Sequence, residues 1–290
     1  MDRPQRVRPV LLLFGLITRL APGLRPRLQK RLVKLGYQLI SRWDVDAVMT
    51  FMNYGYAPLD GAEPGFALSA EDEERRYCIQ LYHRVAGAVD LTGKDVLEVG
   101  CGRGGGVSAV MRYLQPRTIV GIDFAERAIA FCRRRHHIQG LLFGVGDAEL
   151  LPLKAGSFDA VVNVESSHAY PSVERFLREA VRVLRPRGYL LFADVRPVGG
   201  VDRLRAQLAA SGLDMFQEER ITPNVVRALD LDAERRLDLM RRHAPRMFRS
   251  ASYEFAGVKG TAVYEALRRG DMEYVRFVLR KPGPPAVDCG

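Results

Sequence analysis

The sequence predicts an α/β protein built on a mostly parallel, doubly wound sheet. Between residues 91 and 200, apolar segments of six to eight residues alternate with amphipathic helical segments. The apolar residues in the short segments run almost continuously, as expected of strands buried on both faces. Turn residues separate the segments. Such an alternation is typical of parallel strands joined by crossover helices.

The first half of this region contains three expected strands. A turn with the sequence LTGK (91–94) precedes the strand DVLEVG (95–100), and the glycine run that follows opens a helix through VSAVMRYL. The second strand is TIVGIDF (118–124), and it leads into the helical segment AERAIAFCRRRHH. The third strand is LLFGVGDA (141–148).

The second half has two more strands and a looser continuation. FDAVVNVE (158–165) and GYLLFADV (188–195) read as strands, with the amphipathic helix SVERFLREAVRVL between them. Helical segments with an Arg-rich outer face are expected over 201–210 and 224–243. EYVRFVLRK (273–281) is expected to be a final edge strand, followed by a frayed tail.

The positive charge of the chain is concentrated at its N-terminus. The net charge is +10, and residues 1–43 carry ten basic residues and one acidic residue, so the remainder sums to only +1. A nearly neutral body argues against sustained binding to nucleic-acid phosphates. The apolar run VLLLFGLI (10–17) is too short to span a bilayer, Arg19 interrupts it, and no cleavage site of the A-x-A kind follows.

The rest of this N-terminal arm has the pattern of an amphipathic basic helix. Apolar residues recur at three- or four-residue spacing among arginines and lysines, at Leu24, Leu28, Leu32, Leu35, Leu39 and Trp43. We expect the helix to cover the active site or to form the interface of a homo-oligomer. Peripheral docking on an anionic membrane is the alternative. Nucleic acid is the weakest option.

The cysteines do not indicate a metal site or a disulfide framework. The chain has four cysteines, none in a C-x-x-C pair, and no His/Cys cluster has zinc-like spacing. We therefore expect a reduced, cytoplasmic protein without a structural metal.

The stretch EVGCGRGGG (98–106) matches G-x-G-x-x-G through Gly100, Gly102 and Gly105. Ligands of doubly wound sheets bind at the carboxyl ends of the strands, beside the first strand. A dinucleotide would place a pyrophosphate on this loop, whereas S-adenosylmethionine would bring an ammonium, a carboxylate and a cationic sulfur. The carboxylate of Glu98 would repel a pyrophosphate and can hold an ammonium.

Two further acids lie at expected strand ends. Asp123 ends the second strand, where an acid can accept both ribose hydroxyls of either cofactor class. Asp147 ends the third strand and suits an adenine amino group, and Ala148 offers its backbone N–H to the ring. The order of the three acids favours S-adenosylmethionine over three solvated carboxylates placed by chance. Further candidate cofactor contacts are Cys101, Phe124 and Asn163.

Several motifs carry a resemblance to a known family. Through VLEVGCGRGGG, GIDF, GDAELLP, FDAVVNVESSH and EAVRVLRPRGYLLFAD, residues 93–195 resemble class I S-adenosylmethionine-dependent methyltransferases. The resemblance implies a Rossmann-like, seven-stranded sheet with helical lid segments at the N-terminus and before the last strand. FMNYGY, IQLYHR, ESSHAYP, ADVRP and GVKGTAVYEALRRGDMEY are similar to actinobacterial phthiotriol and phenolphthiotriol dimycocerosate methyltransferases. This closer likeness implies O-methylation of a hydroxyl on a lipid, polyketide or other natural product.

With this resemblance the chain divides into five expected segments. The basic arm is followed by N-terminal cap helices and by the cofactor-binding core. A helical lid that binds the acceptor comes next, and an edge strand with its tail ends the chain. The boundaries are 1–43, 44–90, 91–200, 201–272 and 273–290.

The loop after the fourth strand carries the candidate catalytic residues. An alcohol loses its proton as it attacks the methyl group, so a positioned base helps, and the neutral imidazole of His168 suits that task. A purely structural or substrate-positioning histidine is the alternative. Glu165 could touch the methionine part of the cofactor, orient His168 or only hold the loop. Tyr54 and Tyr56 could cover donor or acceptor, or belong to an ordinary packed loop.

Other reactions remain open. Carbon methylation, including cyclopropane formation, and N-methylation use the same donor. Cyclopropane-forming relatives carry Glu directly before the histidine, where this chain has Ser167. A nucleic-acid methyltransferase would favour an N-P-P-Y-like motif, whereas this chain reads N-V-E-S-S-H. A donor-binding scaffold without catalysis is the alternative outside the enzymes.

Overall fold

The structure is a computed structural model that describes residues 49–59, 67–244, 246 and 249–284. The basic arm expected over 1–43 lies outside the described residues. Its helix, its subunit interface and its membrane docking therefore stay predictions. No helix in the described part is long and apolar enough to cross a membrane.

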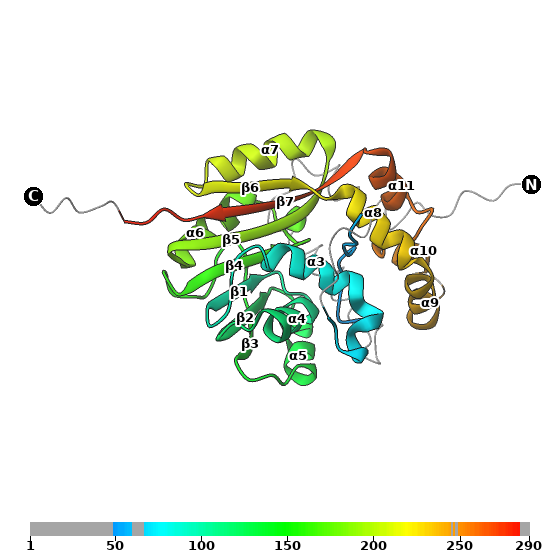
Figure 1. Cartoon of the computed structure of the whole chain (residues 1–290), viewed down its shortest axis with the longest axis horizontal. Coiled ribbons are helices and arrows are strands. Elements are labelled where there is room, and N and C mark those ends of the chain that lie inside the picture. The colour runs from blue at the N-terminus through cyan, green and yellow to red at the C-terminus, as the bar shows by residue number, and fades with distance from the viewer. Residues whose placement is uncertain (1–48, 60–66, 245, 247–248, 285–290) are drawn as a thin grey trace, which may run out of the picture.

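A seven-stranded sheet forms the centre of the molecule, in the order β3-β2-β1-β4-β5-β7-β6 (Figure 1). β7 runs antiparallel to both of its neighbours, and the other strand pairs are parallel. This confirms the expected mostly parallel, seven-stranded sheet. The strands are β1 (Asp95–Val99), β2 (Thr118–Asp123), β3 (Leu141–Val145), β4 (Phe158–Val164), β5 (Leu184–Pro197), β6 (Asp214–Arg220) and β7 (Met272–Arg280).

Helices cover both faces of the sheet. On one face, apolar residues of α3, α4, α5, α8 and α11 pack against inward residues such as Val96 and Val162. On the other face, α6 and α7 pack against Leu97 and Val161. The helices are η1 (Ala70–Arg75), α3 (Arg76–Ala86), α4 (Gly105–Leu114), α5 (Glu126–Arg135), η2 (Ser167–Ala169), α6 (Val173–Val183), α7 (Val198–Ala209), α8 (Thr222–Leu231), α9 (Ala233–His243), α10 (Arg249–Phe255) and α11 (Ala262–Arg269).

The C-terminal part corrects two expectations. β7 is not an edge strand, because it lies between β5 and β6, and seven of its nine residues are buried. The edge strand is β6, inside a stretch that was expected to be a helical lid. β6 has the sequence DMFQEER, six of its residues are exposed, and it pairs with one neighbour only. A polar strand exposed on its outer edge lacks the continuous apolar run that marked the other strands.

The carboxyl ends of the parallel strands gather the acids singled out in the sequence. Glu98 lies near the end of β1, Asp123 ends β2, and Asp147 and Glu165 follow β3 and β4. The segment 49–59 crosses this edge of the sheet, where the carbonyl of Thr50 accepts from the N–H of Gly105 at 3.2 Å. In Figure 1 helices α8 to α11 group at one end of the molecule, away from α5 and β3.

Candidate active site

The glycine turn after β1 allows the backbone to pack closely against two side chains. Gly100 has φ +79°, and a Cβ there would lie 2.5 Å from the Oγ of Ser166. At Gly106, the second residue of α4, a Cβ would lie 1.9 Å from the Cζ of Tyr82. The turn is held to β2 by two N–H groups, of Gly100 and Cys101, which donate to the carbonyl of Ile122. The glycines are therefore required by the approach of neighbouring side chains.

Glu98 is a fully buried acidic residue, and only one of its two side-chain oxygens makes a hydrogen bond among the described residues. The hydroxyl of Tyr82 donates to its Oε1 at 2.7 Å, and Oε2 has no hydrogen-bond partner among the described residues. Burial, reinforced by the nearby Asp123 carboxylate and opposed by the Tyr82 hydrogen bond, raises the pKa of Glu98 to about 8. An acceptor of this kind, which pairs with no cation among the described residues, fits a ligand that brings N–H donors and a positive charge.

The other candidate cofactor residues lie around this turn. Asp123 is buried, and its carboxylate accepts from the N–H groups of Gly102 at 2.9 Å and Ala125 at 2.8 Å. Burial raises the pKa of Asp123 to about 6. Asp147 is half-buried and accepts from the N–H of Glu149 at 3.0 Å. Cys101 and Ala148 are buried, and Phe124 is half-buried at the start of the loop after β2.

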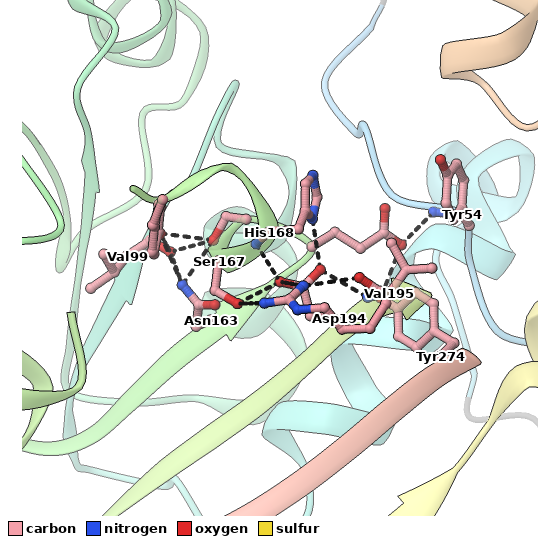
Figure 2. A network of polar contacts seen from close by, with 12 residues as sticks. Tyr54, Val99, Asn163, Ser167, His168, Asp194, Val195 and Tyr274 are labelled. Atoms are coloured by element: carbon pink, nitrogen blue, oxygen red, sulfur yellow. Dashed lines mark hydrogen bonds and ion pairs between the residues drawn. The ribbon is translucent and has the colours of Figure 1, made fainter. Parts of the chain in front are cut away.

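A buried hydrogen-bond network joins the glycine turn to the loop after β4 (Figure 2). The amide nitrogen of Asn163 donates to the carbonyl of Val99, to the Oγ of Ser166 and to the hydroxyl of Tyr170, at 2.8–3.0 Å. Its amide oxygen has no partner in the described part of the chain. Asn163 thus fixes the loop that carries His168 relative to the end of β1.

His168 and Asp194 form a hydrogen-bonded pair at the same edge of the sheet. The Nδ1 atom of His168 lies 2.7 Å from Oδ1 of Asp194, and the backbone N–H of His168 donates to Oδ2 at 2.9 Å (Figure 2). Asp194 is fully buried in β5, whereas 35% of the His168 side chain is exposed. The ring is therefore fixed at Nδ1, and its other nitrogen, Nε2, points away from Asp194.

Three more contacts hold Asp194 in its ionised form. The guanidinium of Arg196 pairs with it at 2.9 Å, the Ser167 hydroxyl donates at 2.6 Å, and the Val195 N–H donates at 2.8 Å. Burial alone would raise the pKa of Asp194, but Arg196 and His168 keep it well below its usual range. Burial would lower the pKa of His168, and the Asp194 carboxylate outweighs it, so the pKa is raised.

Glu165 begins the loop after β4 in a left-handed conformation, with φ +47°. Its Oε1 accepts from the backbone N–H of Tyr54 at 2.7 Å and from the hydroxyl of Tyr274 at 2.9 Å. Burial raises the pKa of Glu165 to about 7 against these two hydrogen bonds, which lower it. The carboxylate is thus tied to the segment 49–59 and to β7, and it does not orient His168 by a hydrogen bond.

The two candidate tyrosines differ in position. Tyr54 is half-buried, its backbone reaches Glu165, and its ring lies against Gly257. Tyr56 is only 5% exposed and belongs to the hydrophobic core. The structure therefore places Tyr54 beside the candidate site and Tyr56 in the hydrophobic core.

Sequence reasoning missed the partners of the candidate residues. Asp194 carried a signal, because it is an acid inside the otherwise apolar strand GYLLFADV. Tyr82 and Tyr274 read as ordinary apolar positions of a helix and a strand. Their hydroxyls matter only because the fold brings them to Glu98 and Glu165.

Comparisons with known proteins identify the family. Residues 97–192 match the model described as "Methyltransferase domain". The phthiotriol/phenolphthiotriol dimycocerosates methyltransferase of Mycobacterium tuberculosis is 42% identical over 255 residues, covering 87% of this chain and 93% of that protein. The chain belongs to the S-adenosylmethionine-dependent methyltransferases. The fatty-acid O-methyltransferase of Mycolicibacterium smegmatis is also similar to this methyltransferase, at 40% identity over 91% of this chain and 95% of that one.

The fold has counterparts among solved structures. The [4+2]-cyclase SpnF aligns with a TM-score of 0.68 at 24% identity, over 87% of the methyltransferase and 96% of that chain. At this identity the likeness concerns the fold alone. The activity is inferred from the sequence family: the chain is a methyltransferase, and S-adenosylmethionine is its methyl donor.

Proposed function

We propose that this methyltransferase methylates a hydroxyl oxygen of a lipid-like acceptor, with His168 as the base. The names of the similar proteins support a lipid or fatty-acid acceptor. The observation that carries the base role is the His168–Asp194 pair, with Nδ1 held at 2.7 Å and 35% of the ring side chain exposed. The expected lid, residues 201–272, is the proposed acceptor-binding region, chiefly through its helices α8 to α11.

The proposed chemistry uses the histidine tautomer that Asp194 imposes. The ionised Asp194 accepts a hydrogen bond from the N–H at Nδ1, which leaves a lone pair on Nε2 to take the hydroxyl proton. S-adenosylmethionine, when bound, supplies a methyl group already activated by a cationic sulfur. The chain's own residues then have to align the acceptor, exclude water and remove one proton.

The glycine turn and the acids around it form the proposed donor site. Glu98 would hold the ammonium, Asp123 the ribose hydroxyls, and Asp147 with the Ala148 N–H the adenine. Cys101 and Phe124 would line the donor with their backbone or ring, and Asn163 would act by fixing the loop. What supports this arrangement is the Oε2 atom of Glu98, which is buried without a hydrogen-bond partner in the part of the chain that the structure describes.

Binding of the donor is expected to release about one proton between pH 6.5 and 7.5. In the free protein Glu98 has a pKa of about 8 and is mostly protonated, and an ammonium beside it favours the carboxylate. Affinity should therefore rise with pH, by up to about tenfold per pH unit. Calorimetry in two buffers of different ionisation enthalpy measures the proton count. Equal buffer dependence of the binding enthalpy in wild type and Glu98→Gln would contradict this role of Glu98.

The pH dependence of turnover tests the proposed acceptor group. With an alcohol acceptor the rate should rise with pH and level off above the raised pKa of His168, because only the neutral imidazole takes a proton. A carboxylate acceptor, the second candidate favoured by the fatty-acid O-methyltransferase relative, needs no base. Its rate would stay flat or fall over the same range. Initial rates with a long-chain alcohol and the matching fatty acid separate the two.

A further inference from the structure

Arg236 is a buried arginine in α9 whose contacts converge on the segment 49–59. Only 7% of its side chain is exposed. Its Nε donates to Asp232 at 2.9 Å, and one terminal nitrogen, Nη1, donates to the carbonyl of Ala256 at 2.9 Å. The other, Nη2, reaches the carbonyls of Asn53 at 3.1 Å and Tyr54 at 3.0 Å. One cation of the lid thus holds two successive carbonyls of another segment.

A single peptide group lies between Arg236 and Glu165. The carbonyl of Asn53 and the N–H of Tyr54 belong to the same peptide unit, and the described chain contains no cis peptide bond. In a trans peptide these two groups point in opposite directions. The carbonyl therefore accepts from Arg236 while the N–H donates to Glu165 at 2.7 Å. A cation at one end and a carboxylate at the other polarise this peptide in the same sense.

We propose that Arg236 is a positioning residue that acts on Glu165 through the Asn53–Tyr54 peptide. By holding the carbonyl, Arg236 keeps the N–H aimed at the carboxylate beside the catalytic loop. The lid and the loop after β4 are thereby coupled. The inference rests on the proposed site, because Glu165 lies next to the loop that carries His168, but it concerns a property of the free protein.

Other charged or titratable groups also face Glu165, from several elements. β7 contributes Tyr274, β5 contributes Asp194, and the loop after β4 contributes His168. Tyr82 and Cys78 of α3 also feel its charge. Among these groups Cys78 contacts Arg236, whose Nη2 lies 3.8 Å from its Sγ, but burial raises the pKa of this thiol, so it stays neutral where Glu165 titrates. A change in the titration of Glu165 would therefore report the peptide between Arg236 and Glu165.

The test is the titration of Glu165 in the full chain without donor or acceptor. Carbon-13 NMR of protein labelled at the glutamate side-chain carboxyl follows the ionisation, and Glu165→Gln assigns the signal. Wild type should titrate near the pKa of about 7. In Arg236→Gln the pKa should rise by about one unit, because the peptide N–H no longer stabilises the carboxylate.

Two further variants separate geometry from charge. Arg236→Lys keeps the charge but cannot reach Asp232, Ala256 and both carbonyls together, so the pKa should still rise. Arg235→Gln removes another cation that pairs with Asp232. Within the described residues the hydrogen bonds of Arg235 go to Asp232 and not to the segment 49–59, so this variant should leave the pKa unchanged. A wild-type pKa in folded Arg236→Gln, or in Arg236→Lys if the glutamine variant does not fold, overturns the proposal. The titration does not depend on the acceptor, so a failed turnover assay would not affect it.

Discussion

Replacement of His168 by alanine is expected to lower turnover by about 100- to 10,000-fold, the range that a positioned base contributes. The substitution removes the imidazole whose Nδ1 is held by Asp194 and whose Nε2 points away from that carboxylate. Donor binding should be unchanged, because Glu98 and the glycine turn do not contact His168 in the described structure. Turnover is measured with saturating donor, and donor affinity by calorimetry.

His137→Ala provides the matched control for this experiment. His137 is exposed in the loop after α5, so its removal should leave both quantities as in wild type. Turnover of His168→Ala close to that of wild type would remove the base role. A loss of donor affinity equal to the loss of turnover would place His168 in donor binding instead.

Replacement of Gly106 by alanine is expected to destabilise the protein and weaken donor binding together. Alanine has the higher helix propensity, worth about 1 kcal/mol in a helix interior. The added Cβ would, however, lie 1.9 Å from the ring of Tyr82, which is buried and cannot move freely. Overpacking of this kind costs about 1–3 kcal/mol or more, so we expect a lower free energy of unfolding in denaturant titrations. Donor affinity should fall by at least about tenfold, because displaced Tyr82 no longer holds Glu98.

Gly199→Ala and Tyr82→Phe are the control variants for Gly106→Ala. A Cβ at Gly199, near the start of α7, meets no atom within 4 Å, so that variant should be as stable as wild type. Tyr82→Phe keeps the ring and removes the hydrogen bond to Glu98, so it should weaken donor binding without the steric cost. If Gly106→Ala binds the donor as tightly as wild type, Tyr82 does not position Glu98.

The sheet could be predicted from sequence because its strands are buried on both faces. β1, β2 and β4 were recognised from continuous apolar runs, and each lies inside the sheet. β6 was missed because an exposed edge strand has one partner and a polar sequence. β7 was predicted as a strand but placed at the edge of the sheet, because its sequence pattern does not show that another strand, β6, pairs along its outer side.

The residues of the candidate site were also predicted only in part. Acids and histidine at strand ends could be named from sequence, because parallel strands end at one edge of the sheet. Their partners could not, since Asp194, Tyr274 and Arg236 come from distant parts of the chain. Which carboxylate pairs with His168 depends on the register of β4 and β5, and that follows from tertiary packing.

The acceptor is identified most directly by following the methyl group. The full chain is incubated with S-adenosylmethionine carrying an isotope-labelled methyl and with an extract of the producing organism, and the labelled products are separated and identified by mass. We expect a labelled methyl ether on a hydroxylated lipid, formed about 100- to 10,000-fold more slowly by His168→Ala. Label in tRNA or rRNA, on an amine, or on a carbon atom of the product would contradict this expectation.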